Sequence, residues 1–175
     1  MITSTSSSQV KHVVNLQKKA KLRKEEKQFV VEGVKMVSEA PADRLVKVYV
    51  SETFKADNEE FLERMNYDSI GKDVLEIVTD NVFMRMADTQ TPQGIMAVVR
   101  MSDTDLEGIL SDKRNPLLLI IENLQDPGNL GTIVRMAEGA GVTGIIMSSN
   151  TVDIYNPKTI RELLRSFKIK TYNED

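Results

Sequence analysis

Apolar and polar residues follow one another along the first hundred residues in a pattern that predicts strands and helices in alternation. Short apolar runs bounded by polar residues predict strands, at residues 29–31, 45–50, 74–78 and 94–99. Amphipathic spacing between them predicts helices, over residues 33–40, 58–65 and 82–87. Strands and helices that alternate at this length are typical of βαβ units. The pattern therefore predicts an α/β domain built on a mainly parallel sheet and closing near residue 101.

A different pattern follows a polar stretch. Residues 102–115 carry charges around a few apolar positions, which predicts a linker that contains a short helix. The unbroken apolar run 117–121 is expected of a central parallel strand buried on both faces. A helix over about 129–139 and a strand at 144–147 are expected next. The predicted organisation is a first domain, a linker and a second domain, over residues 1–101, 102–115 and 116–175.

Composition limits the classes of function that the chain can perform. With 41% apolar and 28% charged residues among 175, the composition is globular, and a net charge of −3 does not by itself indicate nucleic-acid binding. The lack of cysteine excludes disulfides and Cys-His nucleophiles, and with a single histidine, His12, we expect no metal site. The sequence has neither a secretory leader nor an apolar run of about 20 residues, so we expect a cytoplasmic protein without membrane contacts.

Basic residues gather near the start of the chain. Segment 9–24 has six Lys or Arg and no acid, and its apolar spacing, led by Val10 and Val13, predicts one helix with a buried face and a basic remainder. A charged helix face is commonly only solvated, and that alternative stays open. The missing counter-charge favours contact with phosphates instead. The candidate nucleic-acid-binding residues of this segment are Lys11, Lys18, Lys19, Lys21, Arg23 and Lys24.

A polar loop follows the apolar run 117–121 and leads into the next predicted helix. Parallel α/β sheets bind ligands at the edge where such loops lie. Gly128 and Gly131 remove side chains where a partner must approach the backbone closely. Arg135 lies one turn beyond Gly131, and the free N–H groups at the helix start together with Arg135 predict a phosphate cradle. The candidate active-site loop comprises Asp126, Gly128 and Gly131.

Two other interpretations of this segment are open. A dinucleotide-binding turn would have Gly-x-Gly-x-x-Gly, whereas the spacing here is Gly-x-x-Gly, and no acid follows a second strand at the required place. Arg135 could also simply pair with Glu138, three residues further along the helix.

Three motifs in order resemble the SpoU/TrmH family of RNA methyltransferases, members of the SPOUT superfamily. Asp126-Pro-Gly-Asn-Leu-Gly-Thr-Ile-Val-Arg135 is similar to the first motif of the catalytic domain. Phe29-Val-Val-Glu-Gly33 resembles a motif of the family's substrate-binding domain, and Asp88-Thr-Gln-Thr-Pro-Gln-Gly-Ile95 resembles the motif that closes that domain. Together these motifs span nearly the whole chain.

The resemblance implies a fold, an activity and site residues. The fold would be a ribosomal-protein-like α/β RNA-binding domain followed by a SPOUT domain, whose trefoil knot binds S-adenosylmethionine. The activity would be methylation of a ribose 2′-hydroxyl in a structured RNA, ribosomal above all, by a homodimeric parent protein. Asn129 and Arg135 would correspond to active-site residues, and Gln93 would contact RNA. A guanidinium stays charged at ordinary pH, so Arg135 would clamp a phosphate and stabilise the ribose oxygen rather than accept a proton.

The end of the chain departs from the family pattern. Segment 156–161 fits the approach to a second family motif, but Glu162 and its successors look like a later helix and strand. We therefore expect residues to be missing at Arg161–Glu162, an incomplete catalytic domain without the knot, no cofactor-binding residues in this chain, and poor order or intermolecular pairing after Asn150. The chain alone would be inactive. A non-catalytic RNA-binding protein that retains the first domain is the alternative, and a small-molecule nucleotide binder is a third.

Overall fold

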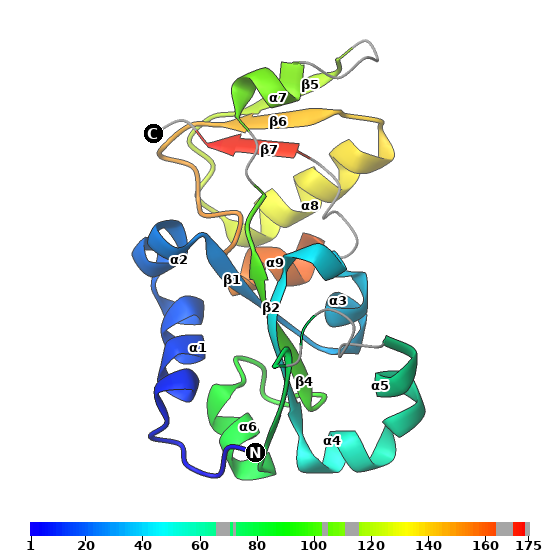
Figure 1. Ribbon diagram of the computed structural model, residues 1–175. Helices are drawn as coiled ribbons and strands as arrows, with labels where there is room; N and C mark the ends of the chain where they lie inside the picture. The colour runs from blue at the N-terminus through cyan, green and yellow to red at the C-terminus, as the bar shows by residue number, and fades with distance from the viewer. Residues whose placement is uncertain (66–70, 72, 103–104, 111–115, 164–169, 174–175) are drawn as a thin grey trace. The chain divides into compact units, whose positions relative to one another are not determined.

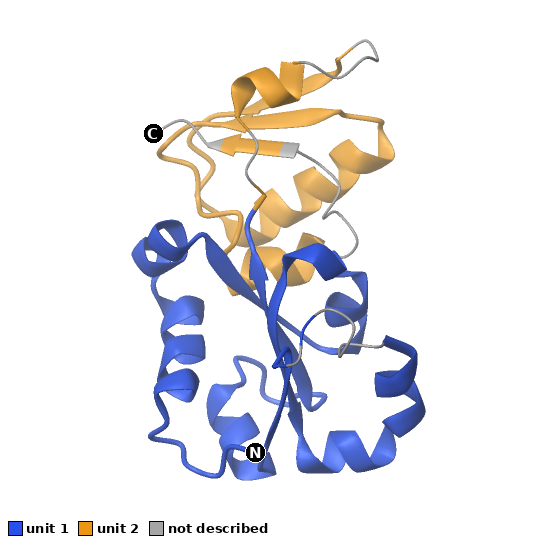
Figure 2. Cartoon of the chain, in the orientation of Figure 1, with its two compact units in different colours: residues 1–101 blue, residues 102–175 orange. Residues whose placement is uncertain are grey.

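The computed structural model describes residues 1–65, 71, 73–102, 105–110, 116–163 and 170–173. It divides into two compact units, residues 1–101 and residues 102–175 (Figure 2). None of the helices in these ranges combines the length and the apolar composition that crossing a bilayer requires.

The first unit is built on a four-stranded sheet with the order β1-β4-β2-β3. Its strands lie where the apolar runs predicted them: β1 (Gln28–Glu32), β2 (Leu45–Ser51), β3 (Leu75–Val78) and β4 (Ile95–Arg100). The predicted mainly parallel sheet is wrong, because β4 is antiparallel to both β1 and β2 and only β2 and β3 are parallel. An apolar run predicts a strand but not its direction, which is decided by the neighbours that it pairs with.

Helices cover both faces of this sheet (Figure 1). One face carries α1 (Ser8–Lys18) and α6 (Asp80–Met86), and its core is continuous across strands and helices. The other carries α3 (Val34–Glu39) and α4 (Glu52–Asp57), followed by α5 (Glu59–Met65). A 3-10 turn, Ala42–Arg44, leads into β2. The residues that join α1 and α6 to the sheet in one core include Val10, Val13, Leu16, Val30, Tyr49, Val82, Phe83 and Met96.

Two helices of this unit differ from the prediction. The single helix expected over the basic segment is instead α1 followed by α2 (Ala20–Glu26), with Lys19 between them in an extended conformation (φ −117°, ψ 103°). The amphipathic spacing continued past this point, but a single extended residue redirects the chain. Helix α4 was not predicted, because Phe54 is its only large apolar residue and the rest of it is polar or small.

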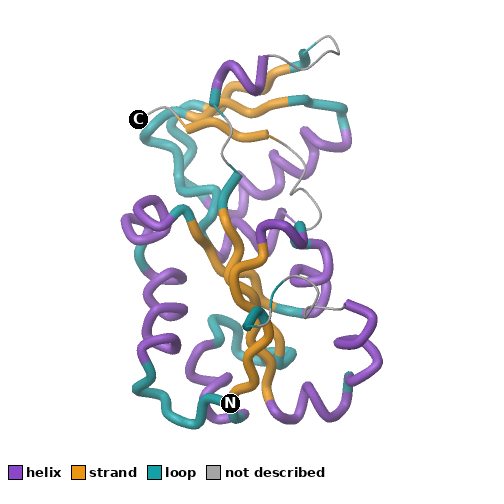
Figure 3. Tube along the Cα trace, viewed as in Figure 1, coloured by secondary structure: helices purple, strands orange, loops and turns teal. Residues whose placement is uncertain are grey.

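The second unit contains a three-stranded parallel sheet with the order β5-β6-β7 (Figure 3). The strands are β5 (Leu118–Ile121), β6 (Gly144–Met147) and β7 (Lys170–Asn173), and the helices are α7 (Leu106–Leu110), α8 (Pro127–Gly139) and α9 (Pro157–Leu163). The central strand is therefore β6. The prediction of a central β5 is wrong among the described strands, and Ile120 of β5 is 71% exposed.

The absence of family residues expected at Arg161–Glu162 stays a prediction, and the described chain is continuous there. Both residues belong to α9, which runs unbroken through this junction, and β7 then adds to the sheet parallel to β6. The two segments are thus consecutive parts of one α/β arrangement. The expectation of poor order after Asn150 concerns in part residues 164–169 and 174–175, which lie outside the described residues.

Candidate functional site

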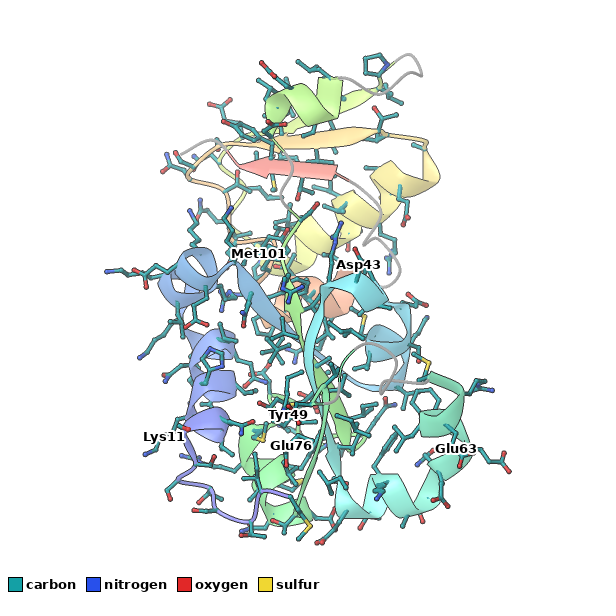
Figure 4. The ribbon with its side chains drawn as sticks, in the orientation of Figure 1. Lys11, Asp43, Tyr49, Glu63, Glu76 and Met101 are labelled. Atoms are coloured by element: carbon teal, nitrogen blue, oxygen red, sulfur yellow. The ribbon has the colours of Figure 1, made fainter. Side chains whose placement is uncertain are left out.

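Exposed lysines follow the two N-terminal helices. Five of the six predicted basic residues, Lys11 and Lys18 on α1, Lys19 between the helices, and Lys21 and Lys24 on α2, are exposed. Figure 4 shows Lys11 on the outer side of α1, turned away from the sheet. The buried face of α1 is formed by Val10, Val13, Leu16 and Gln17. The two helices thus present their lysines to solvent, and we name these five lysines the basic face.

Arg23 does not belong to the basic face, which corrects its place among the predicted RNA-binding residues. Its side chain is only 2% exposed, and one guanidinium nitrogen donates to the carbonyl oxygens of Leu16 and Gln17 at 2.6 and 2.9 Å. These carbonyls lie in the last turn of α1, where helices have acceptors without an intrahelical donor. Arg23 therefore caps α1 from α2. The sequence did not predict this role, because nothing in the basic segment distinguishes Arg23 from its neighbours.

Acids accompany the basic face mainly on α2. His12 on α1 and Glu26 on α2 are joined at 2.6 Å between the imidazole Nε2 and a carboxylate oxygen. Lys21 and Glu25 approach to 3.7 Å, but their side chains are 88% and 58% exposed, and such solvated pairs hold little energy. The positive charge of these lysines is therefore directed mainly toward solvent.

The two motifs of the first unit, residues 29–33 and 88–95, are hydrogen-bonded to each other. The backbone N–H of Asp88 donates to the carboxylate of Glu32 at 2.9 Å, and the Thr89 hydroxyl also donates to it. The side-chain oxygen of Gln93 accepts the N–H of Val34, at the start of α3, at 2.8 Å. Gly33 takes φ +98°, and a Cβ there would lie 2.9 Å from the Gln93 oxygen. Gln93 thus holds this turn in place, and its contact with RNA stays a prediction.

A pocket of about 340 Å³ opens at one edge of the same sheet. The carboxyl ends of parallel β2 and β3 meet there, and Ser51 at the end of β2 donates its N–H to the carbonyl of Gly94, just before β4. Its polar lining includes Asp57, Asn58, Asp80 and Gln93. The sequence analysis did not find this pocket, because its residues come from three separate segments of the chain.

Asp80 is fixed beside this pocket. Its carboxylate accepts the Thr53 hydroxyl at 2.6 Å and the Thr53 N–H at 3.3 Å. The side-chain hydrogen bonds from Thr53 and then Ser51 lower the pKa of Asp80 below its ordinary value. The group is therefore ionised throughout the neutral range and lies at a defined position.

In the second unit the start of α8 is closed by its own cap. Asp126 accepts the N–H of Asn129 on its side chain at 2.7 Å, and its carbonyl accepts the N–H of Leu130 at 3.0 Å. Pro127 occupies the first turn and has no N–H. The predicted phosphate cradle of free N–H groups is therefore wrong for most of this turn, because a carboxylate already occupies it. Asp126 is a helix cap in this structure.

Gly131 allows α8 and α9 to pack closely. A Cβ at Gly131 would lie 2.4 Å from the Cβ of Glu162 and 3.0 Å from the carbonyl of Thr159. The partner that approaches this glycine is thus α9, which corrects the prediction of a ligand there. At Gly128 a Cβ would be 3.2 Å from the Asp126 carboxylate, so this glycine accommodates the cap.

Asn129 and Arg135 are both exposed on α8. Helical geometry separates residues six apart by about 9 Å along the axis and about 120° around it, and no hydrogen bond joins the two in the described residues. The alternative, a pairing of Arg135 with Glu138 three residues further along α8, stays open. The structure brings neither residue to the other, and both side chains face solvent.

The loops that follow β5 and β6 are tied together at the carboxyl edge of the second sheet. Asn123 donates its N–H to the Ser148 hydroxyl at 3.0 Å, and Val152 donates its N–H to the Leu124 carbonyl at 2.8 Å. The Gln125 amide donates to the carbonyl of Asn150. Within the described residues these hydrogen bonds hold the loops after β5 and β6 to each other.

Two family models match consecutive parts of the chain. The MRM3-like substrate binding domain matches residues 7–97, and the SpoU rRNA Methylase family matches residues 116–171. The mitochondrial rRNA methyltransferase 3 of Homo sapiens is 32% identical over 158 residues, covering 85% of this chain and 35% of that protein. The 23S rRNA (guanosine(2553)-2′-O)-methyltransferase RlmP of Bacillus subtilis is 35% identical over 85 residues, 49% of this chain and 32% of that protein.

A solved structure shows the same fold. The AdoMet-bound rRNA methyltransferase from Sinorhizobium meliloti superposes with a TM-score of 0.80 at 24% identity, covering 98% of this chain and 63% of that one. The chain therefore spans about a third of the length of the curated relatives named here, and less than two thirds of this solved structure.

Proposed function

We propose a function from one premise: the chain belongs to the SpoU/TrmH family of RNA methyltransferases, with an MRM3-like substrate-binding domain at its start. The whole protein would transfer a methyl group from S-adenosylmethionine to a ribose 2′-hydroxyl of ribosomal RNA. Relatives named as rRNA and 2′-O-methyltransferases support both the substrate and the position. In this proposal the protein is cytoplasmic and works as a homodimer.

The observation that carries the RNA part is the basic face. Five exposed lysines lie on or between two helices at the start of the substrate-binding domain. The sixth basic residue of the segment, Arg23, is buried and has a structural role instead. Lysines that contact phosphates release condensed counterions, which supplies most of the affinity of such surfaces. The basic face would therefore hold the RNA without reading its bases.

Asn129 and Arg135 would act on the methyltransferase side. Both are exposed on α8, whose first turn, with Asn129, follows the carboxyl edge at which parallel α/β sheets bind ligands. Arg135 lies about 9 Å further along the helix. The planar guanidinium of Arg135 would bind a phosphate of the target nucleotide through two hydrogen bonds, and Asn129 would orient the nucleotide. S-adenosylmethionine would supply the methyl group when bound.

The test is a salt titration of RNA binding by the 175-residue chain. A variant with Lys18, Lys19 and Lys21 changed to Glu should bind a ribosomal RNA fragment at least about tenfold more weakly, with a shallower dependence of log affinity on log salt. The control variant changes Lys35, Lys55 and Arg85 to Glu, three exposed bases outside α1 and α2. It carries the same net charge and should lose much less affinity.

Equal losses in the two variants would show that net charge alone governs binding, and the basic face would lose its assigned role. A methyl-transfer assay on the whole protein, with labelled S-adenosylmethionine and the same RNA, separates the enzyme from the alternative, a non-catalytic RNA-binding protein. RNA binding without transfer of label to the ribose would establish that alternative.

A further inference from the structure

The pocket at the end of the first sheet has a composition unlike that of the basic face. Its floor is apolar, formed by Phe54 and Phe83, which are 7% and 2% exposed. Met84 lines it as well and is 57% exposed. A volume of about 340 Å³ lies at the lower end of the range of roughly 300–1,000 Å³ that ligand pockets span. It is therefore of a size to take one side chain or one small group.

The polar lining of the pocket offers acceptors and negative charge. The carboxylates of Asp57 and Asp80 and the amides of Asn58 and Gln93 line it, and none of the described residues that line it is Lys or Arg. The surrounding helices strengthen this charge. Residues 52–65 contain five acids and two bases, so the surface beside the pocket is acidic.

The acidic surface and the basic face lie on opposite sides of the first unit. Figure 4 places Lys11 on α1 at one side and Glu63 on α5 at the other. An RNA backbone attracted by the lysines would be repelled near α4 and α5, because like charges at short range disfavour binding. The pocket therefore fits a partner of the opposite charge from the one that the basic face attracts.

We propose that this pocket binds an arginine side chain of a basic protein segment, so that the first unit contacts both an RNA and a protein. The aliphatic stem of an arginine would cover Phe54, Phe83 and Met84, while its head remains among polar groups. The guanidinium has five donors in a fixed planar arrangement, and carboxylates accept it through paired hydrogen bonds. Asp57 and Asp80 provide these carboxylates.

Other occupants fit the pocket less well. A phosphate would meet two carboxylates and no cation. A metal ion would need several clustered ligands, and the described residues contain no group of three or more His, Cys, Asp or Glu that could hold one. A lysine ammonium has three donors on a compact head and uses fewer of the acceptors that the pocket offers.

The test uses a fluorescein-labelled peptide of alternating glycine and arginine with the 175-residue chain, followed by fluorescence anisotropy. A matched peptide with citrulline, which keeps the shape but not the charge, should bind at least about tenfold more weakly. In ¹⁵N–¹H spectra the arginine peptide should shift the backbone amides around Thr53, Asp80 and Gly94. Binding of the citrulline peptide with equal affinity would overturn the proposal.

Two single-charge variants separate the pocket from the surface around it. Asp57→Asn should weaken the arginine peptide by about tenfold, the loss of one charge-assisted hydrogen bond, whereas Glu63→Gln, outside the pocket, should have less than about a twofold effect. Met84→Lys, at an exposed position, should also weaken binding. Equal effects of Asp57→Asn and Glu63→Gln, or shifts of the same amides by an RNA oligonucleotide, would rule the arginine site out.

Discussion

The side-chain oxygen of Gln93 accepts the backbone N–H of Val34 at 2.8 Å, across 59 residues of sequence. The bond joins the loop before β4 to the first turn of α3, a turn that also contains Gly33 with its φ of +98°. Two motifs recognised separately in the sequence are therefore hydrogen-bonded to each other in the fold. This contact explains part of their residue types without any role in RNA binding.

Replacing Gln93 with Ala should lower the free energy of unfolding by about 1 kcal/mol, because the Val34 N–H loses its acceptor at a helix start. Gln90→Ala is the control, since Gln90 is exposed in the same loop. Urea denaturation followed by circular dichroism measures both. Equal stability of the two variants would show that the hydrogen bond between Gln93 and Val34 contributes nothing measurable to stability.

Arg23→Ala should destabilise the first unit by about 2–3 kcal/mol, since two carbonyls at the end of α1 would lose a charged donor. Lys24→Ala, which alters the exposed neighbour, should change stability by less than about 0.5 kcal/mol. Below their melting temperatures, Lys24→Ala should weaken RNA binding more than Arg23→Ala. The reverse order would return Arg23 to the RNA-binding residues.

Gly131→Ala should destabilise the second unit by about 1–3 kcal/mol, because the new methyl group would overlap the Glu162 side chain on α9. Gly139→Ala in the same helix is the matched control, since a Cβ there meets nothing within 4 Å. It should be neutral or stabilising by up to about 1 kcal/mol, because alanine favours helix. Thermal unfolding of the two variants distinguishes close packing from a general preference for glycine in α8.

Tyr49 should make the first unit less stable in strong base. Burial, and then the nearby Glu76 carboxylate, raise the pKa of Tyr49 to about 12 (Figure 4). Below pH 10 the phenol is neutral in both folded and unfolded chains, whereas between pH 10 and 12 only the unfolded chain releases the proton. Unfolding free energy should fall by about 2 kcal/mol across that window. Tyr49→Phe should reduce that fall, and an unchanged slope would contradict the assignment.

Arg135→Ala in the whole protein should reduce kcat by about a hundredfold or more, with the dissociation constant of S-adenosylmethionine within a few-fold of its original value. Arg135→Lys should not restore turnover, because an ammonium does not form the paired hydrogen bonds of a guanidinium. Single-turnover kinetics and calorimetry measure the two quantities. A parallel loss of cofactor affinity would show that Arg135 supports the fold of α8 rather than the RNA.

The sequence predicted the elements of this fold better than their arrangement. Apolar runs located β1 to β6, since short apolar runs bounded by polar residues favour strands. The direction of β4 and the edge position of β5 depend on partners distant in sequence, which periodicity does not encode. The candidate site shows the same difference between what local pattern predicts and what tertiary packing decides. The lysines were predicted to be exposed and are, whereas the burial of Arg23 and the contact of Gly131 with α9 depend on tertiary packing.

The position of β4 has a consequence for synthesis of the protein. β4 is the last strand of the first unit to leave the ribosome, yet among the described strands it alone pairs with both β1 and β2. At about 5–20 residues per second, several seconds of elongation therefore separate the synthesis of Gln28 from that of its partner Arg100. Until then the apolar residues of β1 have no sheet to join. The sheet of the first unit is thus completed in one late, long-range step, and until then the nascent chain exposes the apolar residues of β1.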